Sequence, residues 1–323
     1  MKIINKHFFI YFILINLFTS SLFCAQYKVT TKNYNIIVNY DKKAFPGNAF
    51  FVQLKVSDKN DITKEVQNVN ANSFLTKNNS KDEIITNCQF FKTNSQNEYL
   101  AILPMWTTEK ANENAQIIIK YSINNLDFEN IKLNVVIEQK EYPTEEIELN
   151  SELTNLVSKP NEEKKQQTKE LNDLLKSKDD SNIYELDCFT RPVSSKRITS
   201  EFGQSRTFVY NDGKRSPSYH AGLDFGIPTG TKVYACGKGK VVMARWRIVT
   251  GYSVIIEHLP GLYSIYYHLD KLNCKVGDVV TKDDVIAFSG STGLATGPHL
   301  HWEVRLNYVP LDPDFFTNSF IKY

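Results

Sequence analysis

The sequence is poor in cysteine and in net charge, and each shortage argues against a class of function. Only five of the 323 residues are cysteines, and no Cys-x-x-Cys spacing occurs, which argues against a cysteine zinc site or a thioredoxin-like redox centre. The formal net charge is +2 and the sequence pI is near 8.1, so the chain lacks a nucleic-acid-binding footprint. A content of 41% hydrophobic and 23% charged residues is typical of a globular protein with about two domains.

The amino terminus carries the features of a targeting segment. Lys2 and Lys6 precede the apolar run HFFIYFILINLF, which is followed by TSSLFCAQ. This order predicts a secretory signal peptide over residues 1–25, because the run is shorter than the roughly 20 residues that span a bilayer. An amino-terminal membrane anchor or a lipid-modified Cys24 are alternatives, and the bulky Phe23 argues against the second. We expect export to the periplasm or cell envelope.

Four cysteines remain after removal of a signal peptide: Cys88, Cys188, Cys236 and Cys274. An exported chain usually meets an oxidising compartment, and an even number of cysteines permits disulfides without requiring them. The simpler interpretation is that these residues are buried free thiols.

Residues 26–140 contain repeated short runs in which apolar and polar residues alternate, such as FFVQLKVS and NIKLNVVIEQ. Alternation of this kind predicts half-buried strands, and turn-forming clusters such as FPGN and NSQN separate them. The segment is therefore expected to be an immunoglobulin-like β-sandwich. It has no histidine and no clustered acid pair, so we interpret it as a binding or spacer module, with an envelope protein as a candidate partner.

Residues 141–187 differ from both flanks. The run NEEKKQQTKELNDLLKSKDD mixes charges, and Leu171, Leu174 and Leu175 follow Pro160 at helical spacing. The pattern predicts a charged, partly helical linker. A solvated helix laid on a neighbouring domain is a better interpretation of it than a partner-binding segment.

Residues 188–323 form the richest part of the sequence. Short strand-like runs such as TKVYACGKGKVVMARW and YSVIIEHLPGLYSIYYHL are joined by turns that contain glycine. They predict a compact antiparallel β-sheet domain, which makes the whole chain mainly β. Every histidine except His7 lies in this segment: His220, His258, His268, His299 and His301.

The run TGPHLHWEV places two histidines on one face of a predicted strand. Successive side chains of a strand alternate between faces, so His299, His301 and Glu303 point one way while the apolar residues between them face a core. The two imidazoles are then about 6 to 7 Å apart, close enough to serve one small site. Such pairs can also be without function. Glu303 is expected either to orient one histidine as a hydrogen-bond acceptor or to be an ordinary surface carboxylate.

A second group of candidate ligands lies in SYHAGLDFGIP. His220 and Asp224 are four residues apart, a spacing that keeps both on one face in an extended or a helical backbone. An imidazole, a carboxylate and one more imidazole would form a zinc site that leaves a coordination position for water, which is typical of catalytic zinc. His258, in EHLPG, lies at a predicted hairpin turn and is expected to be a surface residue rather than a ligand.

Taken together, the motifs RPVSSKRITSEFG, HAGLDFGIPTGTKVYA, YYHLDKL, VGDVV and SGSTGLATGPHLHWEVR carry a family resemblance. Over roughly residues 188–316 the chain resembles the lysostaphin/LytM-type zinc metallopeptidases, including envelope members with an amino-terminal β-sandwich and a linker. That family hydrolyses peptide bonds in peptidoglycan. The resemblance implies that one Zn²⁺ is bound by His220, Asp224 and His301, and that His268 and His299 flank it as catalytic groups.

The expected function is therefore that of an exported zinc endopeptidase acting on peptidoglycan stem peptides or crosslinks. The alternative is a non-enzymatic relative that activates a cell-wall amidase. Such relatives typically lack metal-binding or catalytic positions, whereas this chain has all five. A surface protein with a vestigial peptidase domain is less well supported for the same reason. Because an exported wall hydrolase threatens its own cell, we also expect the amino-terminal module and linker to restrain the catalytic domain.

Overall fold

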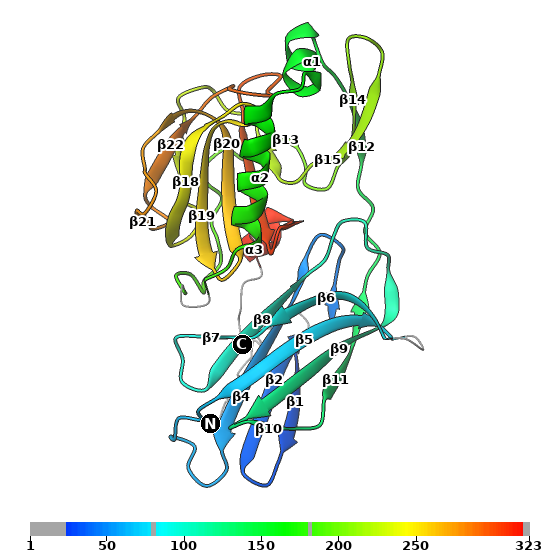
Figure 1. Cartoon of the computed structure of the whole chain (residues 1–323), viewed down its shortest axis with the longest axis vertical. Coiled ribbons are helices and arrows are strands. Elements are labelled where there is room, and N and C mark those ends of the chain that lie inside the picture. Colours follow the sequence, from blue (N-terminus) through cyan, green and yellow to red (C-terminus); the bar gives the residue numbers. More distant parts are fainter. Residues whose placement is uncertain (1–23, 79–81, 180–182, 319–323) are drawn as a thin grey trace, which may run out of the picture.

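The structure, a computed structural model, describes residues 24–78, 82–179 and 183–318. Figure 1 shows two lobes, a lower one built from the blue to green part of the chain and an upper one that ends in red. Both are built mainly from strands, which confirms the mainly β fold class. The predicted signal peptide lies outside the described residues apart from Cys24 and Ala25, which begin β1. Among the described residues, no helix is both long and apolar enough to cross a membrane.

The amino-terminal lobe is a sandwich of two β-sheets. One sheet has the order β1-β2-β4-β8-β7, and the other has the order β3-β11-β9-β5-β6 with β10 beside β9. Alternate residues of the strands, such as Val38, Leu54, Ile117 and Leu133, form one buried core, as the apolar alternation predicts. The strands are β1 (Cys24–Thr30), β2 (Tyr34–Asp41), β3 (Lys43–Ala44), β4 (Ala49–Asp58), β5 (Val69–Lys77), β6 (Glu83–Gln89), β7 (Phe91–Lys92), β8 (Glu98–Pro104), β9 (Asn112–Ile123), β10 (Leu126–Asp127) and β11 (Ile131–Ile137).

The carboxy-terminal lobe is built on a ten-stranded sheet whose central path is β13-β16-β23-β20-β19-β18-β21. Trp302, Tyr266 and Phe225 are fully buried in its main core. The strands are β13 (Ile198–Ser200), β16 (Leu223–Phe225), β17 (Lys232–Tyr234), β18 (Gly239–Arg247), β19 (Gly251–Leu259), β20 (Leu262–Leu272), β21 (Val279–Val280), β22 (Val285–Ser289), β23 (Leu300–Leu306) and β24 (Val309–Leu311), and the short helix α3 (Pro313–Asn318) follows them.

The predicted linker folds into three elements: β12 (Thr144–Glu148), α1 (Ser151–Ser158) and α2 (Glu162–Lys176). The helical part agrees with the prediction, but the strand was not predicted. β12 pairs in parallel with β14 (Ser205–Val209), which forms a hairpin with β15 (Arg215–Tyr219). The sequence TEEIE has poor strand propensity. Pairing with a strand 61 positions later in the sequence, with Thr144 opposite Ser205, makes it extended.

Helix α2 lies against the face of the carboxy-terminal sheet, as Figure 1 shows beside β20. Asn161 caps its start by accepting a hydrogen bond from the Lys164 N–H, which stabilises the first turn. Leu171 and Leu175 are buried in a cluster with Met243, Ile255, Tyr263, Ile265 and Tyr267. Burial of the two leucines stabilises this contact by about 1.5 to 3 kcal/mol each. The helix therefore lies on the neighbouring domain, as its leucine spacing predicts.

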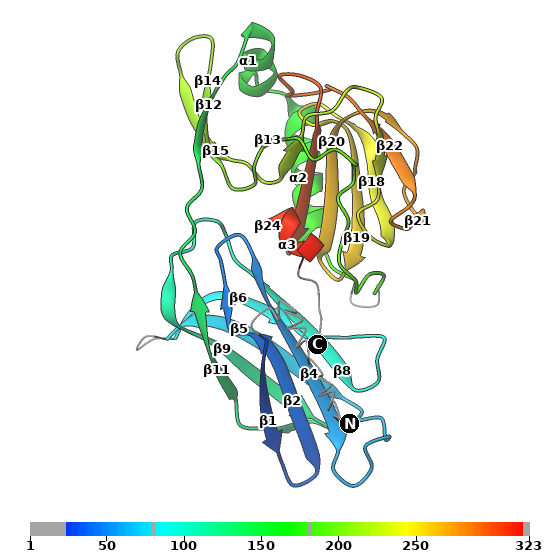
Figure 2. The same ribbon diagram turned by 180° about the vertical axis from the view of Figure 1, so that it is seen from behind.

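The two lobes contact each other through aromatic rings and a few polar groups. Phe51 of β4 stacks on Phe315 of α3 with ring centroids 5.5 Å apart. The Asp312 N–H donates to the Gly47 carbonyl at 2.8 Å, and Lys140 pairs with the Asp312 carboxylate at 3.1 Å. Figure 2 shows α3 on the side of the upper lobe that faces the sandwich. These contacts fix the start of the linker beside the carboxy-terminal lobe.

His258 is fully buried, so the expectation of a surface residue is wrong. It lies near the end of β19, but the Phe189 ring packs on its imidazole at 4.6 Å. The imidazole bonds the Lys238 carbonyl through Nδ1 at 2.8 Å and the Ser264 hydroxyl through Nε2 at 2.7 Å. The turn is covered by a segment that is distant in sequence, and a local pattern does not reveal this. Burial lowers the pKa of His258 to about 4.

The buried imidazole predicts a loss of stability in mild acid. The pKa of His258 is about 4 in the folded chain and about 6.5 in an unfolded chain. Between these values the unfolded state binds the extra proton, so the free energy of unfolding decreases as the pH falls. The neutral imidazole of His258 therefore contributes about 3 kcal/mol to the free energy of unfolding. This contribution is complete above pH 6.5 and lost below pH 4. The free energy of unfolding, measured with denaturant between pH 7 and 4, should depend on pH less steeply in His258→Gln than in the wild type. The difference in slope should correspond to the uptake of up to one proton on unfolding. Identical pH slopes in the two proteins would contradict the low pKa of His258 in the folded chain.

Candidate metal centre

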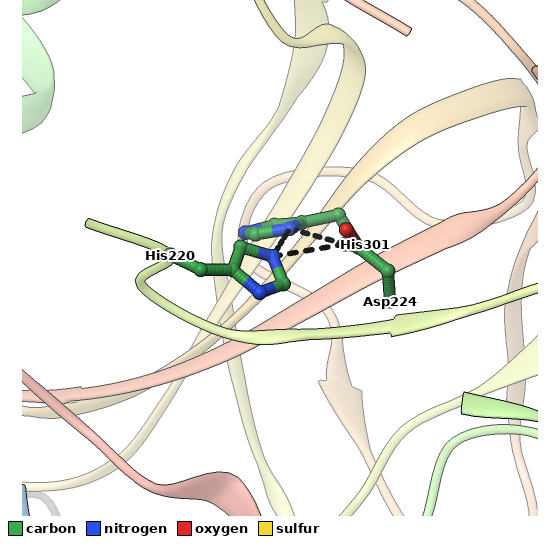
Figure 3. A group of neighbouring side chains, drawn as sticks. All are labelled: His220, Asp224 and His301. Atoms are coloured by element: carbon green, nitrogen blue, oxygen red, sulfur yellow. Dashed lines mark hydrogen bonds and ion pairs between the residues drawn. The ribbon is translucent and has the colours of Figure 1, made fainter. Parts of the chain in front are cut away.

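Three predicted ligands converge in the carboxy-terminal lobe. β16 and β23 pair antiparallel with Asp224 directly opposite His301, and His220 lies just before β16 in the chain. One ligand atom from each residue lies within 4.8 Å of the others. Figure 3 shows the two imidazoles and the carboxylate turned toward one point. The sheet therefore brings together two motifs whose histidines are separated by 81 residues.

The geometry of the three side chains fits a metal ion. His301 Nδ1 lies 2.7 Å from Asp224 Oδ1 and 3.1 Å from His220 Nε2, and His220 Nε2 lies 3.1 Å from the same carboxylate oxygen. These distances are close to the edge of about 3.3 Å in a tetrahedron with metal–ligand bonds of about 2 Å. All three residues are buried. Two imidazole nitrogens and one carboxylate oxygen are a donor set that Zn²⁺ accepts.

The second ring nitrogen of each of these histidines, which faces away from the other ligand atoms, also has a hydrogen-bond partner. His220 Nδ1 lies 2.7 Å from the Glu201 carbonyl, and His301 Nε2 lies 2.9 Å from Glu303 Oε1. Arg305 holds the other oxygen of Glu303 with its Nε at 2.5 Å. Partners of this kind fix the tautomer and the orientation of a metal-binding imidazole. Glu303 is 3% exposed, so it is an orienting acceptor and not a surface carboxylate.

Asp224 is held by a residue of the β14–β15 hairpin. Arg206 donates to Asp224 Oδ2 at 3.0 Å, while Oδ1 faces the two imidazoles. The same guanidinium group lies 3.5 Å from Glu145 of β12. Arg206 therefore fixes the carboxylate so that one oxygen is directed to the centre, and it links the centre to the linker strand.

The charges of the cluster keep its carboxylate ionised. Burial by itself raises the pKa of Asp224, but the neighbouring charge of His301 and hydrogen bonds from His220 and His301 hold that pKa well below its usual range. Burial by itself lowers the pKa of His301, but the carboxylates of Asp224 and Glu303 raise it to about 9. Burial lowers the pKa of His220. Metal binds to a carboxylate and to neutral imidazoles, so a metal ion would displace the proton that the two carboxylates hold on His301.

The two remaining predicted site residues flank the centre. The rings of His268 and His299 are 4.8 Å apart, and His299 Nε2 lies 3.9 Å from Asp224 Oδ1. His268 Nδ1 bonds the Thr292 carbonyl at 2.7 Å, and His299 Nδ1 bonds the Gly297 carbonyl at 2.8 Å. Because a carbonyl only accepts, each Nδ1 carries a hydrogen, and each neutral ring has a bare Nε2. Burial, with the charges of His299 and His301, lowers the pKa of His268 to about 3.

A cavity of about 630 Å³ lies over the cluster, and all five predicted site residues line it. Residues of β12 and of the β14–β15 hairpin line it, together with Val249, Thr250, Leu294 and the segment 296–298. The linker therefore builds one wall of the cavity. The lining residues are Glu145 to Leu149, Thr199, Ser200, Arg206, Phe208, Tyr219, His220, Ala221, Asp224, Val249, Thr250, Tyr267, His268, Leu294, Thr296, Gly297, Pro298, His299, His301 and Glu303.

The sequence did not single out Arg206, Tyr267 or the β12 wall. Tyr267 pairs across strands with His301, and its ring is stacked on the imidazole at 5.6 Å with an angle of 6° between the planes. Its position beside His268 in YYHL was the only available signal. Arg206 and Glu145 lie outside any histidine motif, and only the fold places them next to Asp224.

Comparisons with known proteins agree with this geometry. The sequence pattern of Peptidase family M23 matches residues 218–313. An uncharacterized metalloprotease of Buchnera aphidicola subsp. Baizongia pistaciae is 38% identical over 117 residues, which cover 36% of this chain and 30% of that protein. Peptidoglycan DD-endopeptidase ShyB of Vibrio cholerae is 40% identical over 117 residues, which cover 36% of this chain and 27% of that protein. The matched part is thus less than a third of either relative.

A solved structure resembles both lobes. The crystal structure of a putative peptidase M23 from Pseudomonas aeruginosa matches with a TM-score of 0.55 at 20% identity, and the match covers 86% of this chain and 96% of that chain. At this identity the likeness concerns the fold alone. Within the lobe that holds the His220, Asp224 and His301 cluster, residues 218–313 form a peptidase family M23 domain.

Proposed function

We propose that this protein is an exported zinc endopeptidase that hydrolyses peptide bonds in peptidoglycan stem peptides or crosslinks. The observation that carries the proposal is the buried cluster of His220, Asp224 and His301, which lies within the M23 domain and lines a cavity. A relative named as a peptidoglycan DD-endopeptidase supports the substrate class. The predicted signal peptide supports export to the periplasm or cell envelope.

The residues of the centre would hold one zinc ion through His220 Nε2, Asp224 Oδ1 and His301 Nδ1. When bound, zinc supplies a Lewis acid that polarises a carbonyl and lowers the pKa of water. Glu303 and the Glu201 carbonyl keep the two imidazoles in the required tautomers and orientations. Arg206 keeps the carboxylate turned toward the same point.

His268 and His299 would act on the substrate. Each ring is fixed through its Nδ1–H, so the Nε2 atom is available to the cavity. A neutral imidazole accepts a proton from attacking water and, once protonated, donates a hydrogen bond to the oxygen that develops negative charge or a proton to the leaving amine. The presence of both histidines beside a full ligand set favours an enzyme over an activator of a separate amidase.

The two histidines of one strand should separate in a metal assay. In His301→Ala, loss of one of three ligands should remove most of the zinc and with it the activity. In His299→Ala, the three ligands remain, so zinc should stay bound while hydrolysis slows by about 10²- to 10⁴-fold, the usual contribution of a positioned proton-transfer group. Zinc is measured by atomic absorption, and cleavage is measured by mass analysis of fragments released from purified peptidoglycan.

Each alternative outcome has a distinct meaning. Metal loss in His299→Ala together with metal retention in His301→Ala would reverse the two roles. Retention of both metal and activity in both variants would exclude a zinc peptidase. Mass analysis of the fragments also identifies the bond that is cleaved, whether a crosslink or a stem-peptide bond.

Arg206 provides a test of the outer part of the zinc site. In Arg206→Ala the Asp224 carboxylate loses the group that fixes its Oδ2 atom, so zinc affinity should fall by about 10- to 100-fold. Zinc affinity is measured by competition with a chelator of known strength. The matched control is Arg215→Ala on the same hairpin, whose side chain is 53% exposed and pairs with Glu146. Equal affinity in the two variants would show that Arg206 does not support the ligand.

A further inference from the structure

Helix α2 precedes the segment that matches the family, yet one of its side chains is built into the catalytic lobe. Gln167 is buried, with 7% of its surface exposed. Its Oε1 accepts the Ile248 N–H at 2.8 Å, and its Nε2 donates to Glu163 Oε1 at 3.0 Å. Its backbone carbonyl accepts from Arg247 at 3.3 Å. Two groups of one helical residue therefore bind the start of the loop between β18 and β19.

The same loop reaches the cavity. Val249 and Thr250 line it. The Thr250 carbonyl accepts the His268 N–H at 2.9 Å, and the Val249 carbonyl accepts the Leu294 N–H at 2.7 Å. The loop is therefore hydrogen-bonded both to a predicted catalytic histidine and to the segment that leads to His299.

His268 depends on this support because its backbone is unusual. Its φ is +59°, in the left-handed region that non-glycine residues seldom adopt unless the surrounding structure holds them there. The Thr250 carbonyl bonds its N–H, and the Thr292 carbonyl bonds its ring. A shift of the loop would therefore move the imidazole relative to the metal ligands.

Arg247 strengthens the connection. It is 5% exposed, and its guanidinium group bonds the Gln167 carbonyl with one nitrogen and the Thr250 hydroxyl with another, at 3.1 Å. The Thr250 hydroxyl also lies 2.8 Å from the Ser253 hydroxyl. Leu171 and Leu175 hold the helix itself in the apolar cluster on the sheet. The loop is thus fixed between a packed helix and the strand that carries His268.

We propose that Gln167 is a positioning residue for His268, and that catalysis depends on helix α2 because the helix holds the loop that contacts His268. The kinetic consequence rests on the proposed peptidase function, whereas the structural consequence does not. A side chain of the predicted linker determines where a catalytic imidazole lies, so a fragment that begins at residue 188 lacks a part of the site.

The test compares three variants of the full chain. Gln167→Met keeps a side chain of similar length but removes the acceptor. The double variant Glu163→Gln/Gln167→Glu keeps an acceptor oxygen for the Ile248 N–H and exchanges the amide and the carboxylate of the contact between the two side chains, so that two carboxylates do not face each other. Gln166→Met is the matched control, because the same substitution is made at the neighbouring exposed position of the helix, where the side chain donates to Glu170 at 3.0 Å.

The first measurement is amide hydrogen exchange. In Gln167→Met the amides of Ile248 and His268 should exchange about tenfold faster than in the wild type, because a buried hydrogen bond is lost. Gln166→Met should match the wild type, and the double variant Glu163→Gln/Gln167→Glu should recover most of the protection. The second measurement is hydrolysis of peptidoglycan: kcat should fall about tenfold in Gln167→Met with KM within twofold and bound zinc unchanged.

The outcomes distinguish this inference from the proposed function. Exchange at Ile248 and His268 that is the same in Gln167→Met and Gln166→Met would overturn the inference. Faster exchange throughout the lobe, or loss of zinc, would also overturn it, because it would show a general structural role. If the zinc-loaded wild type hydrolyses no peptidoglycan, the proposed function fails, and the exchange measurement alone decides on Gln167.

Discussion

The antiparallel pairing of β16 with β23 is the constraint on which the rest of the site depends. It places Asp224 opposite His301, and the next pairing, of β23 with β20, places Tyr267 beside the same imidazole. A shift of this register by one residue would turn every one of these side chains to the other face of the sheet. The full burial of Trp302, on the opposite face of β23, fixes the register because the core accepts that ring on one side only.

Burial of charge explains the network around this pairing. Removing an ionised carboxylate from water costs several kcal/mol unless partners compensate for the lost hydration. Asp224 has two imidazoles and Arg206, and Glu303 has His301 and Arg305. The positive and negative groups alternate through the buried cluster, so each charge is compensated by its neighbours. The same contacts that offset the cost of burial also hold the ligand atoms toward one point.

The segments that surround the candidate site extend beyond the family match. The match covers residues 218–313, but β12 forms a wall of the cavity and α2 binds the loop behind His268. The predicted restraint of the catalytic lobe by the amino-terminal module stays a prediction. The structure also shows that a segment of the predicted linker, β12, lines the cavity, so the linker contributes to the candidate site as well as lying close to it. The immunoglobulin-like type of the sandwich and the exported location likewise stay predictions.

The sequence by itself determined the class of fold and supplied the candidate residues of the centre. Alternating apolar residues predicted the strands, because period-two alternation is a local property of a half-buried sheet. The spacing of His220 with Asp224 and of His299 with His301 indicated that each pair shares a face. Only the tertiary structure decided which atoms meet, where His258 lies, that Arg206 and Tyr267 line the site, and that Gln167 accepts a hydrogen bond from the loop that leads to it. These facts depend on strand register and on contacts between distant segments, which no local pattern contains.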